Sequence, residues 1–448
     1  MTRALLIGTG PLPGANPRHV DFPRLRTWQI LRGLLHAGAD VHLVQAVPRS
    51  TLPGWHSRVF EGKRIRTLSV PLEALDRADL PERWLTESRA DLVVSAGPFR
   101  PARAASRTPP GTPVLIDLPG DVMAEAHLRA MVTQNPEHIS HARRLMDSVL
   151  ARGDAFTVIS QAQQHALFGQ LALQGRLGLD PSQCPPVLVT PVAVEPLWQV
   201  WAAQGGPVPR QPHRILWPGS FNTWAATDLF LDACDIAMTR NPALRVIATG
   251  GPIANQAEEV HHSVAHRIAL SPWKNRFRLA GALTAVEAAR EVSRAAVGIM
   301  LDRPCVESIL GSRTRLLYGA VLGLPWVLTP RCELATWLVE SKLARAVPRE
   351  DPDAVADVML EAAEQTRKAD PAVLEQLRRT WTVERTVAGI VAWIKNPESC
   401  PPPVSGIQNI PIQRLQELES ALHEVQNSLT WRTLAPLHRL VRRLVRKR

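Results

Sequence analysis

Short apolar runs alternate with amphipathic segments of helical length along most of the chain. In the first half, apolar runs typical of β-strands occupy residues 3–10, 40–47, 90–98, 112–121 and 154–161. Residues 24–39, between the first two runs, have the spacing of a helix. Strands that alternate with helices predict an α/β fold with a parallel, doubly wound sheet.

The alternation stops at residues 201–213, which are rich in Gly and Pro and are typical of a linker. A second series then follows, with apolar runs at residues 214–220, 244–251, 276–283, 295–301 and 324–330 and a long helical segment at 374–395. Units of about 200 residues have the usual size of a domain. We therefore predict two Rossmann-like domains, residues 1–200 and 213–396, with a cleft between them.

The last part of the chain has a different pattern. Residues 397–411 are Pro-rich and predict a linker, and residues 412–448 predict a helical tail. Its apolar residues first recur at steps of three and four, as in the seam of a coiled coil: Leu415, Leu418, Leu422, Val425 and Leu429. We expect this short seam, about two heptads long, to support an oligomer only weakly. Basic residues then crowd one face of the end of the tail: Arg439, Arg442, Arg443, Arg446, Lys447 and Arg448.

Composition narrows the class of protein. The 448 residues are 45% hydrophobic, and no stretch approaches the ~20 apolar residues of a membrane span. The start, MTRALLIGTGPLPG, lacks the apolar core of a signal peptide. Five scattered cysteines without a CxxC pair predict no disulfide framework and no metal site, which indicates the cytoplasm.

The formal net charge of +11 is concentrated partly in the basic tail. A basic amphipathic end can be a solvated surface or a helix that binds an anionic membrane, each cation contributing ~1 kcal/mol there. Nucleic acid is a third class of basic partner, but the motifs described below do not favour it. The first two interpretations remain open.

In the second unit, two Gly-rich turns follow apolar runs. Gly219 and Ser220 come after the first run, with Asn222 close behind, and Gly250 and Gly251 come after the next. Turns of this kind present backbone N–H groups to anions such as phosphate. The alternative is that the glycines serve the turn alone, as in many parallel sheets.

A further strand-end segment, residues 305–325, carries charge. It reads CVESILGSRTRLLYGAVLGLP and places Glu307 in a short loop before Gly311 and Ser312, which we expect to begin the next helix. A carboxylate accepts hydrogen bonds from a sugar diol, and the guanidiniums of Arg313 and Arg315 suit phosphate. The alternative is an ordinary surface ion pair of Glu307 with one of the arginines, worth about 0–1 kcal/mol.

The first unit offers acidic residues at a strand end. Asp117, Asp121 and Glu125 could hydrogen-bond an acceptor or take its proton. For Asp121 and Glu125 the alternative is a helix cap and a first-turn acid that the helix dipole favours. Three residues are expected on the same side of the cleft, Ser160 as a helix N-cap: Gly10, Gly14 and Ser160.

Taken in order, these motifs resemble bacterial glycosyltransferases of the two-Rossmann-domain (GT-B) architecture, in the group-1 family, of the type found in surface-polysaccharide and O-antigen gene clusters. Five segments carry the resemblance: DLPGDVMAEA at 117–126, VISQAQQHALFGQLALQGRL at 158–177, WPGSFNTW at 217–224, TGGPI at 249–253, and ESILGSRTRLL with GLP within 307–325. The end of the chain, NSLTWRTLAPLHRL, is also similar to tails of such transferases.

The resemblance implies transfer of a sugar from a nucleotide-diphosphate donor, bound by the second domain, to a glycan or lipid-linked acceptor on the first. It also implies retained anomeric configuration, no catalytic metal and no cofactor. Glu307 matches the first acid of the family's Glu-x7-Glu motif, but Arg315, or Tyr318 by another count, stands in place of the second. Basic residues are missing from the Gly219 loop, so Arg313 and Arg315, with Arg278, are expected to supply the charge there.

We therefore predict a cytoplasmic glycosyltransferase, peripheral on the inner face of the plasma membrane, that acts in polysaccharide biosynthesis. The predicted catalytic residues are Glu307, Arg315, Asp117 and Asp121. Two alternatives remain: a nucleotide-sugar 2-epimerase, which shares the architecture, and a non-catalytic scaffold subunit, which the missing second Glu would suit.

Overall fold

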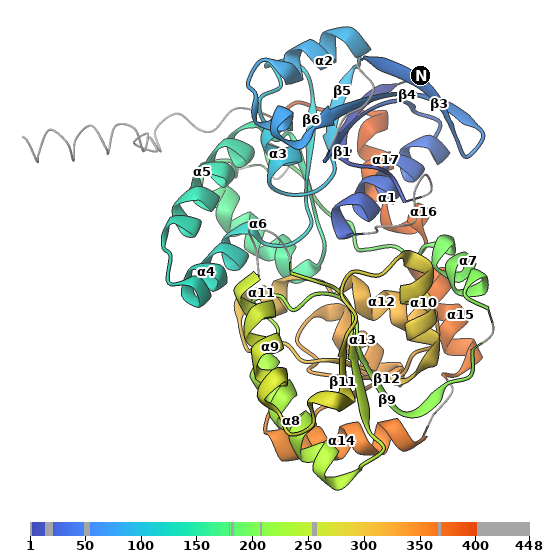
Figure 1. Ribbon diagram of the computed structural model, residues 1–448. Coiled ribbons are helices and arrows are strands. Elements are labelled where there is room, and N and C mark those ends of the chain that lie inside the picture. Colours follow the sequence, from blue (N-terminus) through green and yellow to red (C-terminus); the bar gives the residue numbers. More distant parts are fainter. Residues whose placement is uncertain are drawn as a thin grey trace, which may run out of the picture.

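The computed structural model describes residues 2–13, 21–48, 54–178, 180, 183–206, 208–252, 258–365 and 369–400. These residues form two lobes, each built on one sheet with helices on both faces (Figure 1). Gly14, the predicted linker after residue 400 and the predicted coiled-coil and basic tail lie outside the described residues.

The first sheet has the strand order β3-β4-β2-β1-β5-β6-β7-β8. Its parallel strands are β1 (Arg3–Thr9), β2 (Asp40–Val47), β4 (Lys63–Pro71), β5 (Leu92–Ser95), β6 (Val114–Leu118), β7 (Ala155–Val158) and β8 (Val187–Val189). β3 (Trp55–Phe60) runs antiparallel to β4 at the edge. The β3–β4 turn, Glu61 and Gly62, has positive φ at both residues, as a two-residue hairpin of type I′ requires.

The helices of this lobe follow the strands in sequence. They are α1 (Phe22–His36), α2 (Leu80–Ser88), α3 (Arg100–Ala105), α4 (Val122–Thr133), α5 (Glu137–Arg152) and α6 (Gln161–Leu173), and α7 (Pro196–Gln204) lies in the connection to the second lobe. α1 begins where the Asp21 side chain accepts a hydrogen bond from the backbone nitrogen of Arg24. Its Trp28, Ile30, Leu31 and Leu34 are buried against the sheet.

The second sheet is parallel throughout, in the order β11-β10-β9-β12-β13-β14. Its strands are β9 (Gln211–Trp217), β10 (Arg245–Ala248), β11 (Phe277–Leu279), β12 (Ala295–Met300), β13 (Trp326–Leu328) and β14 (Ala344–Ala346). The helices are α8 (Thr227–Arg240), α9 (Glu258–Leu270), α10 (Ala285–Arg294), α11 (Val306–Leu310), α12 (Thr314–Val321), α13 (Glu333–Glu340) and α14 (Pro352–Gln365).

Both sheets reverse their strand order at the first strand of the lobe. β1 lies between β2 and β5, and β9 lies between β10 and β12. In open parallel sheets, ligands bind beyond the carboxyl ends of the strands at such reversal points. The two-Rossmann-domain fold predicted from the sequence is confirmed, and the Gly10 and Gly219 turns follow the two reversal strands.

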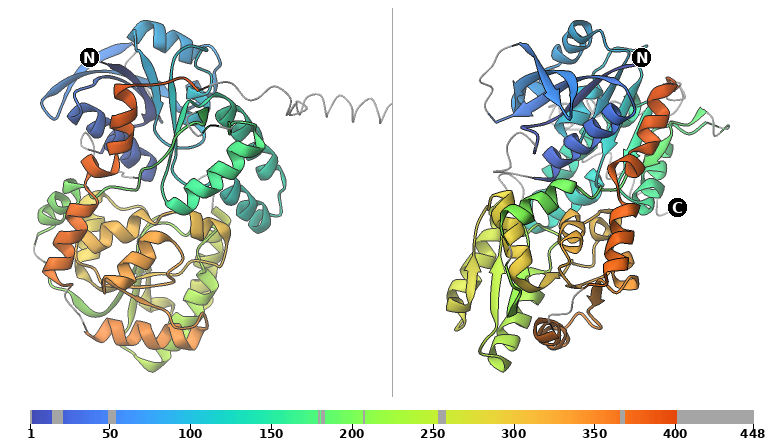
Figure 2. Two further views of the ribbon diagram at one scale, coloured as in Figure 1. Left: turned by 180° about the vertical axis from the view of Figure 1, so that it is seen from behind. Right: turned by 90° about the vertical axis from the view of Figure 1, so that its right-hand side faces the viewer.

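After α15 the chain returns to the first lobe (Figure 2). α15 (Pro371–Thr380) packs on α12 of the second lobe, whereas α16 (Val383–Thr386) and α17 (Ala388–Lys395) pack on α1 of the first. We predicted one helix over 374–395, but it breaks at Trp381, whose carbonyl accepts a hydrogen bond from the backbone nitrogen of Val194. Thr382 then caps α16. None of the described helices is long and apolar enough to cross a membrane.

Candidate functional site

Arg313 is the centre of a buried charge cluster beyond the carboxyl end of β12. Its Nε donates to Asp302 Oδ2 at 2.7 Å, and Nη2 and Nη1 donate to the two oxygens of Glu307 at 2.8 and 3.2 Å. The ring of Trp224 covers the guanidinium, with its centroid 4.9 Å from the guanidinium carbon. Burial alone would lower the pKa of Arg313, but Glu307 and Asp302 outweigh it and raise that pKa further.

The cluster changes two expectations about segment 305–325. Glu307 lies in the first turn of α11 rather than in a loop, and its ion pair with Arg313 is buried rather than on the surface, with Glu307 6% exposed. Gly311 ends α11, and Ser312 follows it, whereas we expected the two to begin a helix; α12 begins at Thr314. Gly311 is required here because a Cβ would stand 2.7 Å from Arg313 Nη1 and 2.8 Å from Glu307 Oε1.

The two predicted Gly turns lie against each other at the carboxyl ends of β9 and β10. Gly219 has φ +78° and donates its N–H to Thr249 Oγ1 at 2.9 Å. Gly250 has φ +90°, and a Cβ there would overlap the backbone nitrogen of Ser220. Gly251 follows with more room, and Asn222 is buried behind the first turn. The turns therefore form one compact backbone surface.

Arg315 supplies a cation to this surface. Its half-buried guanidinium lies beneath Gly219, and Nη1 donates to the carbonyl oxygens of Pro218 and Ser220 at 3.1 and 2.8 Å. No carboxylate of the described residues lies within 4 Å of it. Burial, and then the charge of Arg313, lower the pKa of Arg315 to about 10. It therefore remains a cation near neutral pH, without an anionic partner in the described part of the chain.

Arg278 has different surroundings. It lies on edge strand β11 with 59% of its side chain exposed, and Nη1 is 3.4 Å from Glu291 Oε1. Glu291 also contacts Arg214 and Arg294. The described contacts of Arg278 thus run to the buried Glu291 and not to the Gly219 turn.

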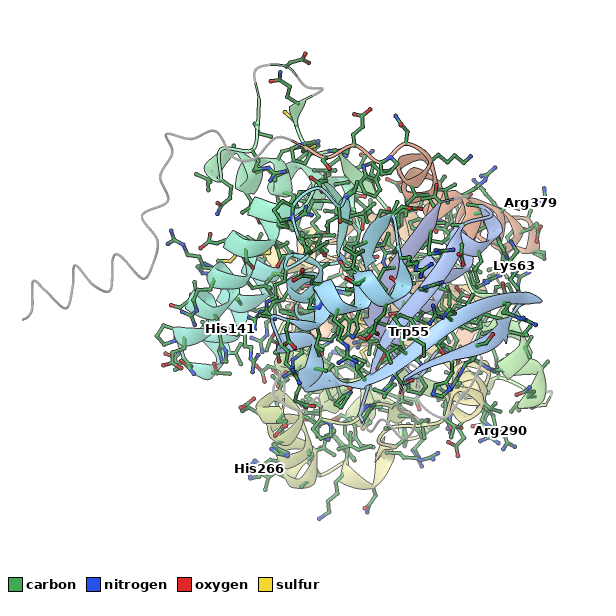
Figure 3. The ribbon with its side chains drawn as sticks, turned by 90° about the horizontal axis from the view of Figure 1, so that it is seen from above. Trp55, Lys63, His141, His266, Arg290 and Arg379 are labelled. Atoms are coloured by element: carbon green, nitrogen blue, oxygen red, sulfur yellow. The ribbon has the colours of Figure 1, made fainter. Side chains whose placement is uncertain are left out.

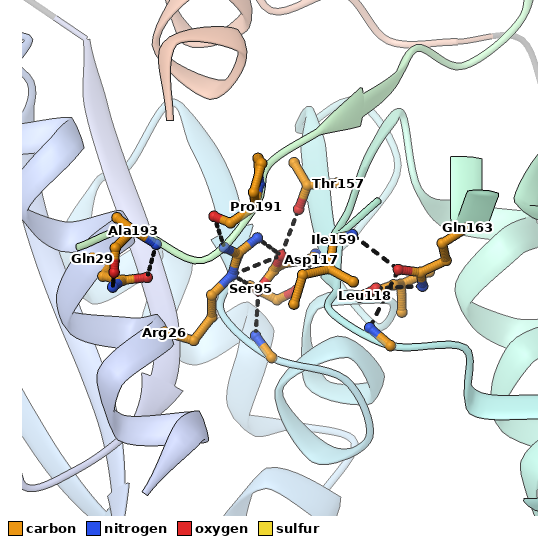
Figure 4. Close-up of polar contacts among 12 residues, drawn as sticks. Arg26, Gln29, Ser95, Asp117, Leu118, Thr157, Ile159, Gln163, Pro191 and Ala193 are labelled. Atoms are coloured by element: carbon orange, nitrogen blue, oxygen red, sulfur yellow. Dashed lines mark hydrogen bonds and ion pairs between the residues drawn. The ribbon is translucent and has the colours of Figure 1, made fainter. Parts of the chain in front are cut away.

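Asp117 is enclosed within the first sheet (Figure 4). It is 0% exposed and accepts hydrogen bonds from Arg26, from the backbone nitrogen of Gly97 at 2.8 Å and from Thr157 Oγ1 at 2.6 Å. Arg26, which comes from α1, is also 0% exposed. Arg26 was not predicted from the sequence, because only the packing of α1 on the sheet turns it towards Asp117. With its oxygens engaged, Asp117 has no open path to an acceptor in this structure.

Asp121 and Ser160 both cap helices. Asp121 accepts from the backbone nitrogen of Ala124 at 2.7 Å and from Gln170 Nε2 at 2.8 Å, so the cap interpretation holds for it. Ser160 caps α6 and also donates to the carbonyl oxygen of Leu310 at 2.7 Å. This second bond joins the first lobe to α11, which carries Glu307.

Glu125 meets the charge cluster from the opposite lobe. It lies in the first turn of α4, which packs on α11. Burial, and then the negative charge of Glu307, raise the pKa of Glu125 from 4.5 to about 7. Glu125 and Glu307, predicted for the two sides of the cleft, are thus brought together. Gly10 follows β1 in the first lobe, and its N–H donates to the carbonyl oxygen of Ala46 at 2.7 Å.

The described residues contain no group of three or more His, Cys, Asp or Glu side chains arranged to hold a metal ion. The assembled site therefore consists of a backbone turn surface, one unpaired guanidinium and a set of buried carboxylates held by a second guanidinium. Such a set can bind a phosphate-bearing anion and hydrogen-bond hydroxyl groups beside it.

No protein-family model and no curated protein sequence matches the chain. Solved structures do match its fold. A sucrose-phosphate synthase from Thermosynechococcus elongatus has a TM-score of 0.67 at 13% identity, covering 88% of this chain and 98% of that one. An α,α-trehalose-phosphate synthase (UDP-forming) from Burkholderia xenovorans, in complex with glucose-6-phosphate, has a TM-score of 0.64 at 11% identity, covering 88% of this chain and 100% of that one. AviGT4, a glycosyltransferase involved in avilamycin A biosynthesis, has a TM-score of 0.51 at 16% identity, covering 88% of this chain and 97% of that one.

Proposed function

We propose that this protein is a glycosyltransferase that moves a sugar from a nucleotide-diphosphate donor to an acceptor held between its two lobes. The observation that carries the proposal is Arg315, an unpaired guanidinium against the Gly219–Ser220 turn at the strand reversal of the second sheet. A diphosphate matches the guanidinium, while the N–H groups of Gly219 and Gly250 already donate to Thr249 Oγ1 and to the carbonyl oxygen of Gly281. The fold shared with sugar-transferring enzymes and a UDP-forming synthase supports the choice.

In this proposal each part of the site has a role. The Gly219 turn and Arg315 bind the diphosphate and stabilise its charge as it leaves, which is the step where preorganised cations act most strongly. Arg313 is a positioning residue that holds Glu307, and Glu307 accepts hydrogen bonds from donor hydroxyls. Glu125, on the acceptor side, is close enough to Glu307 for the two charges to interact. We propose a retaining reaction without a metal or cofactor.

Binding of nucleoside diphosphates tests the donor site. Isothermal titration of UDP, GDP, ADP and dTDP is expected to identify at least one ligand of the parent chain. Arg315→Met should weaken the binding of that ligand about 10- to 100-fold, since a hydrogen bond to a charged group is worth about 1.5–3 kcal/mol. Arg278→Met, which removes the exposed cation beside Glu291, should leave the affinity within about twofold. Equal effects of the two variants would remove Arg315 from the site.

Activity separates transfer from its alternatives. The substrate to test is the nucleotide sugar with the same base as the nucleoside diphosphate that binds. The protein should release nucleoside diphosphate from it faster when acceptor sugars are added. Epimerised nucleotide sugar without an acceptor would replace the proposal by an epimerase, and binding without any turnover would favour the scaffold.

We further propose a glycan or lipid-linked acceptor of surface-polysaccharide or O-antigen synthesis, at the inner face of the plasma membrane. The basic end of the sequence supports this, since it suits an anionic surface. Deleting residues 437–448 should reduce co-sedimentation with phosphatidylglycerol vesicles. Undiminished sedimentation would leave the tail as a solvated end.

A further inference from the structure

A cavity lies at the hinge between the lobes, away from the Gly219 turn. Its volume is about 180 Å³, and its lining comes from α1, from the start of α7 and from the α15–α16 junction. The lining residues are Arg32, Val194, Pro196, Gln199, Arg378, Thr382, Val383 and Glu384. The two chain segments that cross between the lobes meet beside it, where the backbone nitrogen of Val194 donates to the carbonyl oxygen of Trp381 at 2.6 Å. Any ligand here would contact both crossings.

The charged groups around this cavity are paired, with one exception. Arg32 contacts Glu61 at 2.9 Å and Glu195 at 3.0 Å, and Glu384 contacts His36 at 3.1 Å. Arg378 has no carboxylate within 4 Å among the described residues. Its Nη2 donates to the carbonyl oxygen of Val321 at 3.1 Å, while its Nε is buried without a hydrogen-bond partner in the described structure.

Arg378 is partly buried, and a guanidinium that is partly removed from water and has no carboxylate beside it can bind an added anion. Arg378 therefore places a positive charge without a carboxylate partner, in the part of the chain that the structure describes, in the wall of the cavity. A guanidinium binds phosphate or carboxylate oxygens in pairs.

We propose that this hinge cavity is a binding site for the anionic group of a small molecule, a phosphate ester or a carboxylate, with Arg378 as its principal ligand. The site does not depend on the donor site, so either proposal can fail without the other. An anion bound there would contact both crossing segments and thereby link the site to the relative position of the lobes.

Thermal unfolding in inorganic phosphate tests the site, with ionic strength held constant by NaCl. The full chain carrying Arg315→Met is used, so that the Gly219 turn contributes little to phosphate binding. A concentration ten times the dissociation constant should raise Tm by about 2 °C or more, because a ligand of the native state stabilises it by mass action. Adding Arg378→Met should abolish the rise, and acetate in place of phosphate shows whether a carboxylate also binds.

Arg379→Met is the matched control. It removes the neighbouring arginine, which is 77% exposed, pairs with Glu375 and points away from the body of the protein (Figure 3). This control should keep the full rise in Tm. Arg378→Lys, which keeps the charge, should retain part of it, and broadening of the ³¹P signal of phosphate gives a second readout should Arg378→Met lower stability. Equal behaviour of the Arg378→Met and Arg379→Met variants, or no rise in any of them, would overturn the proposal.

Discussion

Arg313 and Arg315 are two residues apart, yet their guanidiniums have different partners and different roles. Arg313 is surrounded by Glu307 and Asp302, and the ring of Trp224 covers it. Arg315, one step into α12, points to the Gly219 turn instead. Residues two apart at a helix start face different directions, so one arginine neutralises buried carboxylates while the other stays available to a ligand.

Glu307→Gln is expected to lower stability as well as turnover. A buried ion pair that loses one partner leaves its other charge uncompensated. We expect the free energy of unfolding to fall by roughly 3 kcal/mol, less if Asp302 compensates. Urea denaturation measures it. Glu364→Gln, on the exposed face of α14, is the control and should change it by less than about 0.5 kcal/mol.

Glu195 predicts a pH dependence of stability. It is 0% exposed, and burial raises its pKa from 4.5 to about 7 although Arg32 opposes this. Between these values the carboxyl is protonated only in the folded protein, so the stability it contributes is full below pH 4.5 and is lost as pH rises through about 7. Relative to Glu195→Gln, the parent should lose up to about 3 kcal/mol of unfolding free energy between pH 4.5 and 8. Parallel pH curves for the two proteins would show that Glu195 does not titrate in this range.

At the scale of elements, the stacked glycine turns require the absence of one side chain. Gly250→Ala would place a Cβ on the backbone of Ser220 and push the turns apart, so it should abolish binding of the nucleoside diphosphate. Gly281→Ala has a similar positive φ of +68° but meets no atom within 4 Å. It carries only the backbone strain and should keep most of the affinity. Titration calorimetry distinguishes the two, and similar losses would mean that strain, not overlap, decides.

The alternation of apolar runs and helical segments was enough to predict the central strands of both sheets, because a parallel strand buried on both faces leaves a continuous apolar run in the sequence. The short edge strands β8 and β14 were not predicted. The Gly219 and Gly250 turns followed from their place after such runs. The β3–β4 hairpin at the edge was not predicted, since β3 is mostly exposed and has no such run.

Contacts between distant residues could not be predicted in this way. Arg26 reaches Asp117 across 91 positions, and the helical pattern around it gives no sign of a buried arginine. The pairing of Glu307 with Arg313 was foreseen only as a surface contact, because burial depends on α4 and α6 of the other lobe packing on α11. The return of α16 and α17 to the first lobe likewise depends on tertiary packing and not on local periodicity.

At the scale of the whole molecule, α16 and α17 complete the first lobe. Val383, Val387, Ile390, Trp393 and Ile394 are buried in the core that includes α1. A chain that ends after residue 381 should therefore unfold more readily than one that ends after residue 400, by at least about 3 kcal/mol, given about 1.5–3 kcal/mol for each fully buried apolar side chain. Thermal unfolding of the two truncated chains compares them. Equal stability would mean that the first lobe holds its core without these helices.

The return of α17 also bears on how the protein is made. A ribosome finishes β8, the last strand of the first sheet, about 200 residues before it finishes α17. At a synthesis rate of 5–20 residues per second that interval is roughly 10–40 s. During this time the surface that α17 will cover on α1 has no partner from the same chain, although the rest of the first sheet is complete. The nascent protein is thus most exposed to aggregation and to chaperones while its second lobe is still being synthesised.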